Sequence, residues 1–149
     1  MDQEIYVFKV KLGYDKRVWR EIGIRGSQTL HDLSLAIVDA FDFYDWHLYS
    51  FFMSGRAWDP STEYVTPDYV QDPWDEKMRA DEVRISSLGL ELKQRFLYLF
   101  DYGDEWRFEV QFLKCITSEE GVDYPHVTKR RGESPHQYPP DEDESFTSS

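Results

Sequence analysis

The chain opens with two runs in which apolar and polar residues alternate. In residues 4–12, every second position is apolar, namely Tyr6, Phe8, Val10 and Leu12. A period of two is typical of a strand with one buried face. Residues 18–25 repeat the pattern, and the turn-forming segment 13–16 connects the two runs. The pattern therefore predicts an antiparallel hairpin at the start of the fold.

The next segment changes to the spacing of a helix. Its apolar residues fall three or four positions apart, at Leu30, Leu33, Ile37, Ala40 and Phe41. This spacing places them on one face of a helix. Ser27 and Thr29 offer a hydroxyl group that can cap the first turn, and Asp32 and Asp39 fall on the polar face. We therefore predict one main helix that begins near residue 29.

Residues 47–53 return to alternation, and residues 95–100 and 106–114 form a second hairpin pattern around the short connection 101–105. Residues 57–82 read as a long polar loop with three of the seven prolines. The order ββαβ…ββ predicts an α+β fold with a β-grasp-like beginning. We expect a mostly antiparallel mixed sheet of about five strands, with one main helix packed across it.

Length and composition set the domain organisation. A chain of 149 residues is enough for one core, and aromatic residues make up 17% of it. We predict a single α+β domain over residues 1–116. Residues 117–149 carry eight acidic residues and four prolines, so we predict an acidic C-terminal tail whose last ten residues are disordered.

Charge narrows the range of partners. The chain has 17 Lys and Arg against 29 Asp and Glu, a net charge of −12, and such a surface repels phosphate backbones and anionic lipid. We therefore expect no nucleic-acid partner and no membrane. An unknown protein partner fits this surface, and we expect a monomer or weak dimer. Cys115 is the only cysteine, which excludes an internal disulfide, and we expect a buried thiol. Because the first ten residues lack a basic and an apolar region, we predict a cytoplasmic protein.

Several motifs resemble one known family. They are Val-Trp-Arg at 18–20, Thr-Leu-His-Asp-Leu at 29–33, His-Leu-Tyr-Ser-Phe at 47–51, and above all Tyr-Leu-Phe-Asp-Tyr-Gly-Asp-Glu-Trp at 98–106. In this order and spacing they resemble the Ri-plasmid open-reading-frame-three-like family, and residues 131–139 resemble its usual ending. The resemblance implies a small bacterial or archaeal protein, a passenger of plasmids or insertion elements, with no established reaction. Tyr102 departs from the phenylalanine that the family favours.

Two groups of side chains are candidates for chemistry. The loop 101–105 contains Asp101, Asp104 and Glu105, and its aspartates can shape the turn by accepting backbone N–H bonds. They could instead bind a hard cation or receive a basic peptide. His47 could act as a general base, although a structural histidine held by a carboxylate is the more common case.

These observations lead to two hypotheses. The first is a non-enzymatic protein-interaction or accessory module with an exposed aromatic and acidic surface, made of Trp46, Trp58, Tyr102, Glu105 and Trp106. The alternative is a metal-dependent or acid/base hydrolase that uses His47 with Asp101 and Asp104. The sequence contains no glycine-rich phosphate loop, nucleophile elbow or HExxH motif, so we predict no cofactor and no bound metal.

Overall fold

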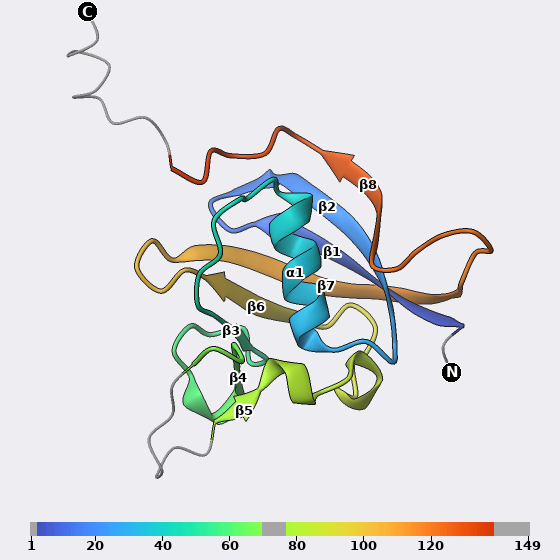
Figure 1. Ribbon diagram of the computed structural model, residues 1–149, viewed down its shortest axis with the longest axis horizontal. Helices are drawn as coiled ribbons and strands as arrows, with labels where there is room; N and C mark the ends of the chain where they lie inside the picture. Colours follow the sequence, from blue (N-terminus) through green and yellow to red (C-terminus); the bar gives the residue numbers. More distant parts are fainter. Residues whose placement is uncertain (1–2, 70–76, 139–149) are drawn as a thin grey trace, which may run out of the picture.

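In a computed structural model, which describes residues 3–69 and 77–138, the chain forms one eight-stranded sheet with a helix across one face (Figure 1). The order of the strands is β5-β4-β3-β6-β7-β1-β2-β8, and only the β4–β5 pair is parallel within the described part. The main elements are β1 (Glu4–Leu12), β2 (Asp15–Arg25), α1 (Leu30–Ala40), β3 (Tyr49–Phe52), β4 (Glu63–Val65), β5 (Met78–Arg79), β6 (Arg95–Phe100), β7 (Trp106–Thr117) and β8 (His126–Arg131). Three short 3₁₀ helices lie at Pro60–Thr62, Ala80–Glu82 and Ile85–Ser87.

Both hairpins and the helix confirm the predictions from periodicity. β1 pairs with β2 and β6 pairs with β7, each in antiparallel register. Thr29 caps α1 by accepting the backbone N–H of Asp32, and the Asp32 carboxylate accepts the N–H of Thr29 in return. This capping box satisfies two donors that the first turn of a helix leaves free.

The core lies between α1 and one face of the sheet. Leu33 and Ile37 of α1 are fully buried there with aromatic side chains of the strands, among them Phe8, Tyr98 and Phe108. Rings supply much of the buried area, as the composition predicts. No helix in the described ranges is long and apolar enough to cross a membrane.

The predicted number of strands, about five, was too low. β4 and β5 lie inside the segment 57–82, which we had predicted to be a loop, and residues 70–76 of that segment lie outside the described residues. β4 and β5 have three and two residues, too few to show an alternating pattern. β3 also begins two residues later than predicted, at Tyr49.

The sheet also continues past residue 116, into the segment predicted to be a tail. β7 ends at Thr117, and β8 pairs with β2 along the far edge of the sheet. β8 has no buried residue, so no hydrophobic alternation marked it in the sequence. The predicted disorder of the last ten residues falls outside the described residues.

The chain after β8 packs against the end of α1. Arg20 of β2 is 2% exposed and donates hydrogen bonds to the carbonyl oxygens of Ala40 and Arg131, at 2.9 Å each, and to Ser134 Oγ at 3.0 Å. A buried guanidinium needs such partners, since an unpaired buried charge is costly. These bonds fix the segment after β8 beside the loop that follows α1, where the candidate site lies.

Candidate functional site

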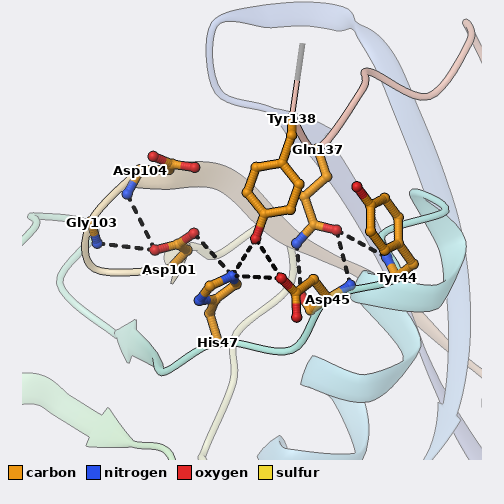
Figure 2. Close-up of polar contacts among 8 residues, drawn as sticks. All are labelled: Tyr44, Asp45, His47, Asp101, Gly103, Asp104, Gln137 and Tyr138. Atoms are coloured by element: carbon orange, nitrogen blue, oxygen red, sulfur yellow. Dashed lines mark hydrogen bonds and ion pairs between the residues drawn. The ribbon is translucent and has the colours of Figure 1, made fainter. Parts of the chain in front are cut away.

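His47 is the centre of a polar cluster at one end of the sheet (Figure 2). It lies in the loop between α1 and β3, with a side chain that is 33% exposed. Its Nε2 atom is 3.5 Å from Asp101 Oδ2, 3.6 Å from Asp45 Oδ2 and 2.5 Å from the hydroxyl oxygen of Tyr138. Two carboxylates and a phenol from three separate segments thus meet at one imidazole nitrogen.

The hydrogen bonds define which ring nitrogen carries a proton. The Tyr138 hydroxyl donates its single hydrogen to Asp45 Oδ2 at 2.8 Å. The contact between Tyr138 and His47 Nε2 then requires Nε2–H to donate to the phenol oxygen. In a neutral His47, the lone pair that can act as a base is therefore on Nδ1.

Asp101 is held by the hairpin loop between β6 and β7. Its Oδ1 atom accepts the backbone N–H groups of Gly103 and Asp104, at 3.0 and 3.2 Å, while Oδ2 faces His47. Its backbone has a φ of 68°, in the left-handed region that Asp and Asn tolerate better than most residues. The turn-shaping role predicted for Asp101 is thus present, together with a contact to His47.

Asp104 does not join the cluster. Its backbone N–H donates to Asp101, and among the described contacts its carboxylate makes none with His47. The structure therefore brings together two of the three proposed catalytic residues, His47 and Asp101, and adds Asp45 and Tyr138. These two were missed because Tyr138 lies 93 residues from Asp45, and no local pattern marks such a contact.

Hydrogen bonds from the segment after β8 hold this cluster beside the chain that follows α1. The side-chain amide oxygen of Gln137 accepts the backbone N–H groups of Tyr44 and Asp45, both at 3.0 Å, and its NH₂ donates to the Asp45 carbonyl at 2.7 Å. Gln137 is 3% exposed. The hydrogen bond to Asp45, followed by desolvation and the charges of nearby carboxylates, raises the pKa of Tyr138 to about 12.

The two exposed tryptophans predicted to belong to one surface lie on different faces of the sheet. Trp46 is 36% exposed and its ring contacts His31, Tyr49 and Phe100. Trp58 is 48% exposed and contacts Phe52 and Tyr102. Tyr49 and Phe52 lie three positions apart in β3, and of the two only Tyr49 belongs to the core under α1. Successive residues of a strand point to opposite faces, so these two side chains lie on opposite faces of the sheet. Trp46, which contacts Tyr49, and Trp58, which contacts Phe52, therefore lie on opposite sides of the sheet.

Three other predicted surface residues have structural contacts. Trp106 was expected to be exposed, and this is wrong, since it is 7% exposed and packs against Phe43 in the core. Tyr102 is only partly exposed, because its hydroxyl donates to the Tyr49 carbonyl at 3.0 Å and contacts Ser50 Oγ at 2.7 Å. Glu105 is exposed and pairs with Arg107 at 2.8 Å.

Comparisons with known proteins give a family for the chain and a solved structure that it resembles. A family model described as plasmid pRiA4b ORF-3-like protein matches residues 4–141. The chain belongs to this family. It is also similar to the crystal structure of MM3350, a protein of unknown function from Methanosarcina mazei Go1, with 26% identity and a TM-score of 0.73. The match covers 91% of this chain and 73% of that one. Comparison with curated proteins gave no match.

Two further candidate groups in this member of the pRiA4b ORF-3-like family are a metal site and the thiol of Cys115. No set of three His, Cys, Asp or Glu residues within the described ranges is arranged to hold a metal ion. Cys115 is exposed, so the expectation of a buried thiol was wrong. Desolvation of the sulfur, followed by the hydrogen bond and charge of Glu4, raises the pKa of Cys115 to about 11. This thiol is therefore a poor nucleophile near neutral pH.

Proposed function

We propose that this chain is a non-enzymatic interaction module of a plasmid or mobile element, and that it binds a basic segment of a partner protein. The family description, which refers to a plasmid open reading frame, supports the first part. The second part rests on what we call the aromatic–acidic surface, made of Tyr44, Asp45, Trp46, His47, Asp101, Asp104 and Tyr138.

The observation that supports this second part is that no lysine or arginine among the described residues forms an ion pair with Asp45, Asp101 or Asp104. The basic group that contacts Asp45 and Asp101 is His47. The charges of all three help to raise the pKa of Tyr138, which is what a local negative potential does to a phenol. A lysine or arginine from a partner would be attracted to this potential.

Exposed rings lie next to these charges. Tyr44 is 79% exposed and Tyr138 is 41% exposed, and their rings meet edge to face. Aromatic faces attract ammonium and guanidinium groups, and aromatic side chains are enriched where proteins bind one another. Carboxylates flanked by rings therefore favour a partner rich in Arg and Lys.

The hydrolase alternative keeps one observation in its favour, the contact of His47 with two carboxylates. That contact supports an acid/base role for His47 with Asp101 and Asp104 only if a substrate can reach a basic nitrogen. Nε2–H is already donated to Tyr138, and Asp104 does not contact the imidazole, so the free lone pair on Nδ1 would have to serve. The arrangement therefore fits a binding surface better than a general base.

A titration can test the proposal. We would add a fluorescein-labelled octapeptide of alternating arginine and glycine to the protein and follow anisotropy, with alternating glutamate and glycine as the reversed-charge control. Asp104→Asn and Tyr44→Ala should each weaken binding about two- to fivefold, the size of one lost exposed charge or cation–π contact.

Matched controls are available on the same chain. Tyr14→Ala removes another tyrosine, 67% exposed with one ring contact, and Glu91→Gln neutralises another exposed acid. Both should bind like the wild type, and mass spectrometry should recover the peptide uncut. Equal losses in the control variants would refute the proposed surface. Cleavage of the peptide that disappears in His47→Gln would favour the hydrolase instead.

A further inference from the structure

β8 is an edge strand that carries a run of positive charge. It pairs with β2 on one side and has no neighbouring strand on the other side within the described part of the chain (Figure 1). Its last three residues are Lys129, Arg130 and Arg131, all exposed. An edge strand presents unpaired backbone donors and acceptors, which another extended chain can use.

None of these three cations forms an ion pair within the part of the chain that the structure describes, although Lys129 lies opposite Glu21 in the ladder. The chain as a whole has 29 acidic residues against 17 basic ones. Arg130 also lies near the buried Arg20, and its charge, after burial, lowers the pKa of Arg20. An anion placed beside β8 would therefore relieve repulsion inside the protein as well.

The cations point to both faces of the sheet. Lys129 and Arg131 lie opposite Glu21 and Trp19 of β2, whereas Arg130 lies opposite Arg20, whose side chain reaches the α1 side. Residues directly opposite in a ladder share a face. A strand added to β8 would itself alternate between the faces, so consecutive acidic residues on it would each lie near a cation.

The first half of β8 has a different environment. Between it and α1 lies a cavity of about 410 Å³, lined by Val127 and Pro125 together with Ile22, Leu35 and Ala36. Asp32 and Asp39 also line this cavity, and they would repel an acidic side chain. An apolar side chain from an added strand fits this end of β8, and acidic side chains fit the other end.

We infer that β8 is a docking edge for an acidic extended segment of a partner protein, which adds to the sheet as an antiparallel strand. In that orientation two or three acidic residues come first, opposite Lys129–Arg131, and an apolar residue follows opposite Val127. This site is separate from the aromatic–acidic surface and does not depend on the function proposed above.

Two other occupants fit less well. A second copy pairing through its own β8 would bring two sets of three cations together along one edge, which is repulsive. A nucleic acid would meet a chain of net charge −12 with a charge on every nucleotide, whereas a peptide carries only a few charges. A short acidic strand combines backbone pairing with local attraction.

The probe is a fluorescein-labelled octapeptide, Glu-Glu-Glu-Thr-Val-Thr-Thr-Gly, titrated into the full chain. We expect saturable binding that weakens at least tenfold in the double variant Lys129→Glu, Arg131→Glu. A control double variant, Arg56→Glu with Lys93→Glu, makes the same change in net charge at exposed positions outside β8 and should bind as the wild type does. Circular dichroism melts would establish that both variants fold.

A second peptide tests for strand pairing. It carries proline at its third and fourth positions, so that one proline removes an N–H facing β8 whichever register is adopted. It should bind at least tenfold more weakly than the first peptide. Equal binding of the two peptides, equal loss in both double variants, or no saturable binding to the wild type would overturn the inference. So would tighter binding of a dodecamer of thymidylate, or a dimer of the free chain that Lys129→Glu, Arg131→Glu dissociates.

Discussion

At the scale of single residues, Asp101 links the hairpin loop to the candidate site. One carboxylate oxygen shapes the turn and the other faces His47, while the backbone adopts a positive φ. Its turn-shaping role could be predicted from the loop composition, since Asp and Gly at these positions favour such bonds. Its proximity to His47 was part of the hydrolase alternative, but no local pattern in the loop indicates that contact, because it depends on how β6 and the loop before β3 meet.

The two aspartates of this loop should therefore respond differently to substitution. Asp101→Asn keeps an acceptor for the two N–H groups and tolerates the positive φ, so we expect a loss of about 1 kcal/mol in the free energy of unfolding. Asp101→Ala removes the acceptor and should cost about 2 to 3 kcal/mol. Asp104→Asn should cost less than about 0.5 kcal/mol. Urea unfolding of the three variants measures this order, and equal costs at both positions would contradict it.

At the scale of elements, periodicity predicted the parts that have one buried and one exposed face. β1 begins and ends where the alternation does, and the apolar stripe of α1 is the side that packs on the sheet. The short strands β4 and β5 and the exposed strand β8 lack such a face, so their pairing is decided by neighbours distant in the sequence. The strands that the sequence did not predict are mostly of this kind, short or without a buried face.

The helix provides a direct test of its packing. Leu33 and Ile37 are fully buried, and truncating either to alanine should cost about 2 to 5 kcal/mol in unfolding free energy. Leu35 lies on the same helix but is 46% exposed, so Leu35→Ala serves as the control and should change stability much less. Thermal or urea melts would measure all three. A near-neutral result at both Leu33 and Ile37 would mean that this stripe does not anchor the helix.

At the scale of the whole molecule, the C-terminal segment joins the far edge of the sheet to the end of α1. β8 pairs with β2, Ser134 meets Arg20, and Gln137 bonds to the backbone at Tyr44 and Asp45 (Figure 2). Composition made this segment look like a tail, because acidic residues and prolines are common in it. Its contacts use a few buried polar groups rather than an apolar face, so no pattern of hydrophobicity revealed them.

Two truncations separate the part of this segment that stabilises the fold from the part that does not. Ending the chain after Tyr138 removes Pro139, Pro140 and an acidic run with little apolar surface to bury, so we expect an unchanged melting temperature. Ending it after Gly132 removes four part-buried hydrogen bonds, the three of Gln137 and the one from Arg20 to Ser134. It also removes the exposed bonds of Ser134 to Asp42 and of Tyr138 to Asp45 and His47, which contribute less. At about 0.5 to 1.5 kcal/mol for each of the four part-buried bonds, that loss should reach about 2 to 6 kcal/mol.

Gln137→Ala in the full chain provides the intermediate case, because it removes three of the four part-buried bonds without shortening the chain. It leaves the N–H groups of Tyr44 and Asp45 without their acceptor, and it should therefore account for most of the loss seen on truncation after Gly132. If both Gln137→Ala and that truncation had the melting temperature of the wild type, the contacts of this segment would not stabilise the domain. If Gln137 stabilises the fold and the residues beyond Tyr138 do not, the folded unit ends at Gln137 and Tyr138. These two residues also complete the cluster around His47.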